Sequence, residues 1–135
     1  MVFQIAMQIV LWLWFFGCIK TYRIKEHVLV EGMGVKSAEF GMLVFYSVGI
    51  ILQLLFPWGK WYQLGVLIFW IAVQFICHWR YTIFGASPAK LKGYNECFEK
   101  TVKLFPASET RIVPDLYHVV LHLLIIINIL LLLLI

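Results

Sequence analysis

The chain has 135 residues, of which 63% are hydrophobic and 13% are charged, and its formal net charge is +4. Soluble domains average about 25% charged residues, and a soluble fold of this length could not bury so much apolar surface. The composition therefore excludes an ordinary soluble domain and predicts a single polytopic membrane domain over residues 1–135. Because no basic run with interleaved aromatic residues stands apart from the apolar segments, we expect no nucleic-acid partner.

Four apolar segments are long enough to cross a hydrocarbon core, which needs about 20 residues and tolerates roughly 17. They cover residues 2–19, 40–56, 61–84 and 114–135. The helix of the first segment is expected to continue to about residue 30. The tight turn at residues 57–60 makes the second and third segments antiparallel neighbours.

An amphipathic helix is predicted over residues 88–105, between the third and fourth segments. Ser87 and Pro88 are typical of a helix start, because a hydroxyl caps the first turn and proline suits the first helical position. Apolar residues then follow at helical spacing, which favours a helix lying on the bilayer or on the bundle. The expected fold is an all-α membrane protein, a four-transmembrane-helix bundle with one amphipathic cytoplasmic helix.

The charged residues are confined to two stretches. Residues 20–39 and 80–115 contain all seven acidic residues and ten of the eleven Lys and Arg residues, Lys60 being the exception. With an even number of spans both stretches fall on one side, and the positive-inside rule makes that side cytoplasmic and both termini external. The sequence shows no organelle address signal, which favours a bacterial plasma membrane.

A stripe of ionisable residues opens the fourth segment. Asp115, His118 and His122 stand at positions i, i+3 and i+7, which places them within about 60° of one another on a helix. Ionisable residues inside a membrane are costly and indicate functional sites. The predicted ligand-binding site adds His78, Gln74, Tyr81 and Arg80 from the third segment and Asn128 from the fourth.

Three interpretations of this stripe remain open. In the first, Asp115 biases the imidazoles of a proton relay or ligand cavity. In the second, His118 and His122, with His78 as a further ligand, hold a divalent metal, although two histidines at i and i+4 are a weak metal signal. In the third, the residues only make hydrogen bonds between helices, worth about 0.6 kcal/mol each on average.

A second polar set consists of Gln4, Gln8, Gln53 and Gln63. Hydrogen bonding between helices explains it, but it could also line the outer half of a polar path that Gln74 connects to the histidines.

Smaller features lie near the charged side. Arg80 is expected to reach lipid head groups, and Trp79 and Tyr81 to form an aromatic belt. In the first loop Glu26, His27 and Glu31 are either a solvated face or a lid over the histidines. The three cysteines, Cys18, Cys77 and Cys97, are expected to be reduced packing residues.

We therefore expect a small integral membrane protein that binds or transports a small solute, with proton coupling, through a His/Asp-lined site open to the cytoplasm. One alternative is a membrane-embedded enzyme acting on a lipid or isoprenoid at the inner leaflet, with Arg80 and Arg111 holding an anionic head group. The other is a non-catalytic accessory subunit of a membrane complex. The expected partners are the lipid bilayer, the solute or lipid, and a second copy or a membrane partner protein.

Overall fold

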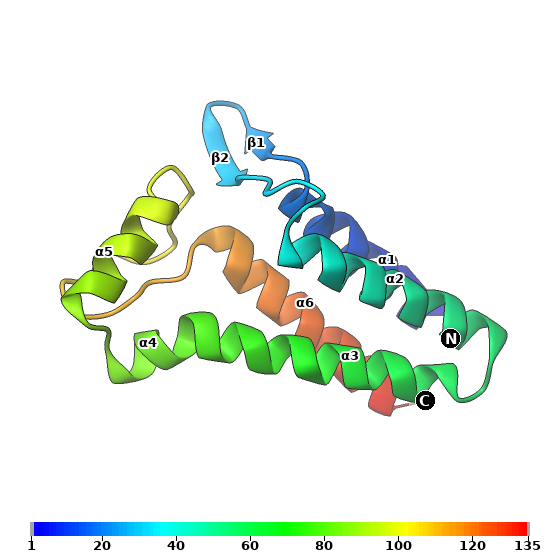
Figure 1. The fold of residues 1–135 in the computed structure, drawn as a ribbon. Coiled ribbons are helices and arrows are strands. Elements are labelled where there is room, and N and C mark those ends of the chain that lie inside the picture. Colours follow the sequence, from blue (N-terminus) through cyan, green and yellow to red (C-terminus); the bar gives the residue numbers. More distant parts are fainter. Residues whose placement is uncertain (1, 135) are drawn as a thin grey trace.

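The chain is mainly helical in the computed structural model, which describes residues 2–134 (Figure 1). In chain order the elements are α1 (Val2–Phe15), η1 (a 3-10 turn, Phe16–Cys18), β1 (Tyr22–Ile24), β2 (His27–Val30), α2 (Ala38–Leu55), α3 (Gly59–Gln74), η2 (a π-helical turn, Phe75–Trp79), α4 (Arg80–Phe84), α5 (Pro88–Cys97) and α6 (Leu116–Leu133). The elements α3, η2 and α4 run on as one helix of 26 residues.

Three helices are long and apolar enough to cross a membrane, namely α2, the continuous α3–η2–α4 helix and α6. Their outer faces expose large apolar side chains such as Phe45, Phe69 and Leu123, as insertion into lipid requires. The apolar helix Val2–Cys18 is shorter. Ile135, the last residue of the fourth expected segment, lies outside the described residues, as does Met1.

Local capping explains where the helices begin. The Ser37 hydroxyl accepts a hydrogen bond from the Phe40 amide at 3.2 Å, and the Ser87 hydroxyl accepts one from the Lys90 amide at 3.3 Å. Asp115 caps α6 in the same way. Each side chain satisfies an amide that has no partner inside its own helix. The start at Ser87 agrees with the sequence pattern.

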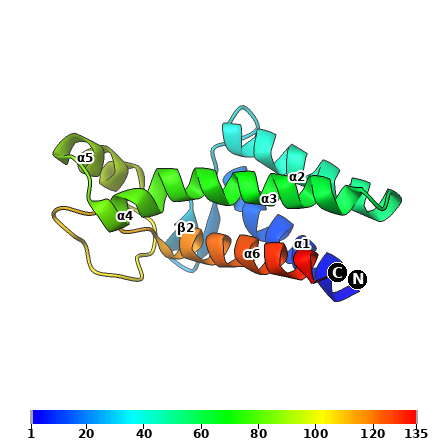
Figure 2. The ribbon, with the colours of Figure 1, turned by 90° about the horizontal axis from the view of Figure 1, so that it is seen from below.

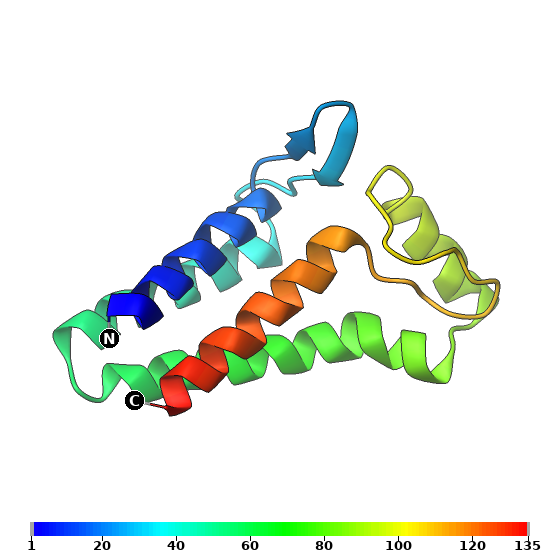
Figure 3. The ribbon, with the colours of Figure 1, turned by 180° about the vertical axis from the view of Figure 1, so that it is seen from behind.

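The helices form a ring of four in two layers. Helix α2 packs along α3, α3 along α6, α6 along α1, and α1 returns to α2. Figure 2 shows α1 and α6 below the α2–α3 pair, and Figure 3 shows the same two layers from behind. Helices α2 and α3 meet at the Pro57 turn and diverge toward the end that carries the hairpin and α5 (Figure 1).

The first loop corrects one expectation, because the first helix does not continue to residue 30. It ends in η1, and residues 22–30 form an antiparallel hairpin of β1 and β2. Val28 and Val30 are β-branched, which favours a strand. The Met33 amide donates to the Cys18 carbonyl at 2.6 Å and returns the chain to the end of α1.

The second loop corrects another expectation, because the helix predicted over residues 88–105 ends at Cys97. Residues 98–115, which we call the strap, connect α5 to α6 and bond to two other elements. The Val102 amide donates to the Val28 carbonyl at 3.2 Å, and the Val102 carbonyl accepts from the Leu116 amide at 2.9 Å. The strap thus ties β2 to the start of α6, and tertiary hydrogen bonds replace those of a longer helix.

A buried apolar layer crosses the middle of the bundle. Phe15 and Tyr46 pack against Trp70, with ring centroids 4.2 Å and 5.6 Å from the indole. The layer is completed by Leu11, Leu67, Leu121 and Ile125, all at most 1% exposed. This apolar layer separates the two polar regions of the bundle.

Candidate functional site

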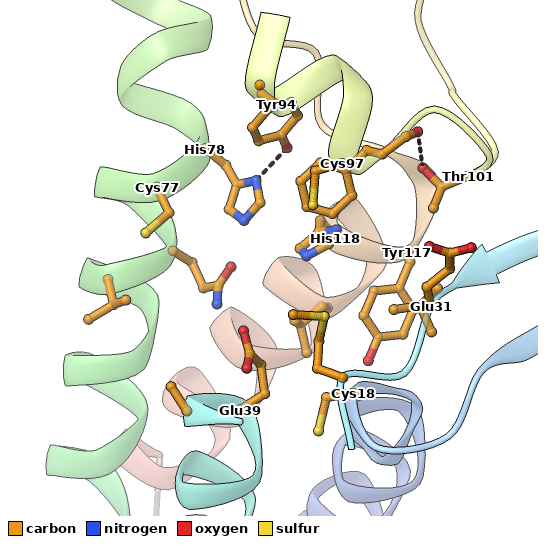
Figure 4. Close-up of a pocket in the computed structure, with 18 of the residues that line it drawn as sticks. Cys18, Glu31, Glu39, Cys77, His78, Tyr94, Cys97, Thr101, Tyr117 and His118 are labelled. Carbon is orange, nitrogen blue, oxygen red and sulfur yellow. Dashed lines mark hydrogen bonds between the residues drawn. The ribbon is translucent and has the colours of Figure 1, made fainter. Parts of the chain in front are cut away.

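A cavity of about 640 Å³ occupies the wedge between α2 and α3, on the charged side of the apolar layer (Figure 4). We call it the inner cavity. Its walls come from the ends of α1 and β2, the start of α2, the α3–η2 helix, α5 and the start of α6. Its chemically active lining residues are Cys18, Glu31, Glu39, Gln74, Cys77, His78, Lys90, Tyr94, Cys97, Thr101, Tyr117 and His118.

Asp115 and His118 form a hydrogen-bonded dyad at the start of α6. One carboxylate oxygen, Oδ1, accepts from the His118 backbone amide at 2.9 Å and from Nδ1 of its ring at 2.7 Å. A carboxylate only accepts, so Nδ1 carries a proton. The other ring nitrogen, Nε2, has no hydrogen-bond partner within residues 2–134, and His118 lines the inner cavity. The dyad therefore presents one free imidazole nitrogen to that space.

The charge of Asp115 is maintained although the residue is only 1% exposed. Burial by itself raises the pKa of this carboxyl, but the hydrogen bonds from the ring and amide of His118, and the charge of that ring, lower it more. The net shift is below the ordinary value of 3.8. Asp115 is therefore an anion at neutral pH and accepts the Nδ1 hydrogen of His118.

His78 faces the dyad from η2. Its ring centroid lies 4.4 Å from that of His118, and its Nδ1 shares a 2.5 Å hydrogen bond with the Tyr94 hydroxyl of α5. Figure 4 shows this bond at the top of the inner cavity. Burial raises the pKa of Tyr94, and the Asp115 charge raises it further, so the phenol stays protonated. Two imidazoles this close do not both carry a positive charge readily.

His122 is held in one neutral state by two partners. The Trp79 indole N–H donates to its Nδ1 at 2.9 Å, and its Nε2 is 3.0 Å from Gln74 Oε1. An indole only donates, so Nδ1 is unprotonated and Nε2 carries the hydrogen that it donates to Gln74. Both ring nitrogens are thus occupied. The structure places His122 as a neutral support of the site.

The π-helical turn η2 makes this arrangement possible. Gln74 and Trp79 are five residues apart, yet both reach the same imidazole. In an α-helix residues four apart align, whereas a π turn aligns residues five apart, and such turns are frequent at functional sites. The insertion brings Gln74, His78 and Trp79 together on the inner side of the helix.

We expect the change Trp79→Phe to release the His122 tautomer, because the ring is kept and its N–H is lost. Nitrogen-15 NMR of histidine-labelled protein should show one Nε2–H tautomer for His122 in the wild type and a mixture in the variant. The signal is assigned with His122→Gln. An unchanged spectrum would contradict the bond.

Five predicted site residues are not part of the lining of the inner cavity. Asp115 and His122 bond to the lining residues His118 and Gln74, whereas the other three lie apart from the site. Arg80 is exposed and lies over the Tyr81 ring, 5.9 Å from its centroid, and Tyr81 is not part of the lining. Asn128 lies near the opposite end of α6, where its amide donates to the carbonyls of Met7 and Leu124 at 3.2 Å and 2.8 Å. Its role is packing between α6 and α1.

The glutamines form a separate chain of amides. Gln63 donates to Gln8 at 3.4 Å, Gln8 to Gln53 at 2.7 Å, and Gln53 to Gln4 at 2.8 Å. On α3, buried Leu67 and Trp70 of the apolar layer come between Gln63 and Gln74. The amide chain is therefore not joined to the histidines through a continuous polar path.

Several cavity residues had no functional signal in the sequence. Tyr94 stands in the sequence as an apolar-face position of the predicted helix. Trp79, which lies outside the lining and donates to His122, stands there as a member of an aromatic belt. The three cysteines are free and line one cavity although they come from η1, η2 and α5. In the first loop Glu31 lines the cavity, whereas Glu26 and His27 are exposed and do not.

The residues described give little basis for a metal centre. Within residues 2–134, no three His, Cys, Asp or Glu side chains converge in a way that could hold a metal ion. Arg111 lies outside the inner cavity and donates to the Thr82 carbonyl at 3.3 Å.

Comparison with known proteins finds no matching family model, no matching curated protein and no matching solved structure.

Proposed function

We propose that this chain is a small integral membrane protein that binds, and by changing conformation transports, a small organic solute in the inner cavity. The observation that carries the proposal is a cavity of about 640 Å³ against which the Asp115–His118 dyad presents an unoccupied imidazole nitrogen. Pockets for small molecules commonly measure about 300–1,000 Å³ and combine apolar walls with a few placed polar groups.

The proposed topology has four spans, with α1 and η1 as the first. Their 14 and three residues come close to the shortest span that a hydrocarbon core tolerates, roughly 17 residues. The ring of four helices supports this count, because α1 packs against both α2 and α6. Positive residues then place the hairpin, the strap and α5 in the cytoplasm of a bacterium, with the termini outside.

A site that closes toward the outside suits binding better than an open pore. Phe15 and Leu121 of the apolar layer line the inner cavity, and Trp70, which packs against Phe15, is only 2% exposed. A solute that enters from the charged side therefore meets a closed end, and passage would require Trp70 and its neighbours to move. After such a movement, the amide chain of Gln4, Gln8, Gln53 and Gln63 on the other side of the layer would receive the solute.

Proton coupling is proposed for His118. Its Nε2 faces the inner cavity, and Asp115 stabilises the protonated ring. A solute that bonds to Nε2 takes the place of a proton there, so its affinity should depend on pH. The pH dependence should be absent in His118→Gln and kept in His27→Gln, whose side chain is exposed outside the cavity.

Filling the cavity tests the proposal directly. Gly93 lines it, and a Cβ atom added there meets no atom within 4 Å, so Gly93→Leu should fold and reduce the space in the cavity. We expect native mass spectrometry of the protein in detergent to detect a retained small molecule in the wild type and none in Gly93→Leu. Gly65→Leu is the matched control, because Gly65 is equally open but outside the cavity. Equal spectra for all three proteins would refute the proposal.

A second candidate is an enzyme acting on a membrane lipid, because an Asp–His dyad with a free Nε2 is also an arrangement for general-base catalysis. The positions of Arg80 and Arg111 outside the cavity leave the expected anion-holding groups away from the dyad. A retained molecule that is recovered chemically unchanged would favour binding over catalysis.

A further inference from the structure

The charges around the inner cavity indicate the class of solute. Three lining residues outside the dyad have charged side chains, namely Glu31, Glu39 and Lys90. Glu31 lies 3.8 Å from Lys100, and both side chains are largely exposed, so that charge is compensated at the rim. The Lys90 ammonium lies 5.0 Å from the ring centroid of Tyr81, which is outside the lining.

Glu39 is the lining acid without a partner, because no described residue bonds to its carboxylate or forms an ion pair with it. Figure 4 shows this carboxylate directed from the start of α2 into the inner cavity. On the opposite wall His78 and His118 are too close to be cationic together, and the ionised Asp115 balances the one charge they can hold. The start of α2 therefore brings an unpaired negative charge to its wall of the inner cavity, while Lys90 belongs to the wall formed by α5.

The remaining walls suit the same kind of solute. The rings of Phe15, Tyr94, Phe98 and Tyr117 line the space, and the faces of aromatic rings attract cations. A solute with an apolar body and a delocalised or hindered positive charge would satisfy both the rings and Glu39. An organic anion would be repelled by the unpaired carboxylate of Glu39, which is exposed and lines the same space.

We propose that the solute is a hydrophobic organic cation and that Glu39 is its counter-ion, an inference that rests on the proposed function of the inner cavity. The position of Glu39 in the first turn of α2 also suits the helix dipole. A role limited to the dipole predicts a change in stability only, whereas a counter-ion predicts a change in binding that depends on the sign of the solute charge.

The test uses two ions of the same shape and opposite charge, tetraphenylphosphonium and tetraphenylborate, in equilibrium dialysis with the full chain in detergent. We expect the wild type to bind the phosphonium more tightly than the borate. Glu39→Gln should weaken phosphonium binding by roughly five- to tenfold, as expected for one lost charge contact, and should not weaken borate binding. Glu96→Gln is the control, because Glu96 is an exposed acid of α5 outside the cavity.

Protection of cysteines from a thiol reagent tests whether the ion binds in the inner cavity. Cys77 and Cys97 are exposed and line the inner cavity, so phosphonium bound there should slow their reaction with N-ethylmaleimide. Borate bound as tightly as phosphonium, or phosphonium binding unaffected by Glu39→Gln, would overturn the inference and leave the proposed function standing. If neither ion binds while the wild type retains a molecule that Gly93→Leu lacks, the inference alone fails. If neither ion binds and no molecule is retained, both fail.

Discussion

The change Asp115→Ala is expected to destabilise the folded protein by about 2–4 kcal/mol and to abolish binding in the inner cavity. Part of the loss is the cap of α6, worth about 1 kcal/mol. The rest is the buried hydrogen bond to the charged or polarised His118 ring, worth about 1.5–3 kcal/mol. Apparent melting temperature in detergent measures the first effect, and retention of the bound molecule in native mass spectrometry measures the second.

Asp115→Asn separates the cap from the charge. Asparagine still caps a helix well, so α6 should keep its start, while the ionic partner of His118 is lost. The pH profile supplies a second readout, because the folded pKa of Asp115 is depressed. Its stabilisation is complete above the ordinary value of 3.8 and is lost as the pH falls through the lower folded pKa. The wild type should lose stability in that acid range and both variants should lose less. Parallel profiles for all three would contradict the ionised dyad.

The change Gly59→Ala is expected to cost about 1–3 kcal/mol or more and to loosen the α2–α3 hairpin. A Cβ atom at Gly59 would overlap the carbonyl group of Leu52 and the amide nitrogen of Gln53. These are backbone atoms of α2, so they cannot turn aside as the end of a side chain can. The apparent melting temperature in detergent should fall clearly.

Gly65→Ala is the matched control for this prediction. Gly65 lies on the same helix, and a Cβ atom there meets nothing within 4 Å. Alanine is a better helix former than glycine by roughly 0.5–1 kcal/mol, so this variant should be as stable as the wild type or slightly more stable. Equal melting temperatures for Gly59→Ala and Gly65→Ala would contradict the close approach of α2 and α3 at the Pro57 turn.

The apolar segments and their starts could be predicted because both depend on residues that are close in sequence. Ser87 caps the helix that follows it, as predicted, and a cap needs only the next three residues. Asp115 was predicted as a binding residue, and its role as the cap of α6 emerged only from the structure. Membrane-compatible helices at α2, α3–η2–α4 and α6 follow from the length of uninterrupted apolar sequence, since lipid cannot satisfy an unpaired backbone. The four-span count stays a prediction, because α1 with η1 is shorter than the three helices that are long enough to cross a membrane.

The same local reasoning failed in the two charged loops. The helix expected to reach residue 30 gave way to a hairpin, and the helix expected to reach residue 105 ended at Cys97. The reason is shared, because Val102 bonds to Val28 and to Leu116, which are 74 and 14 residues away in the printed sequence. Partners so distant cannot be found from local propensity.

The amino-acid sequence by itself determined that this chain suits a membrane, that its charges gather in two loops, and that Asp115 and His118 share one face of a helix. Only the tertiary structure decided which of the predicted residues meet. The π turn η2 lets Gln74 and Trp79 hold His122 neutral, and the divergence of α2 from α3 opens the inner cavity beside His118. Helix geometry follows from short-range backbone bonding, whereas an extra residue in one turn and the angle between two helices follow from packing across the whole bundle.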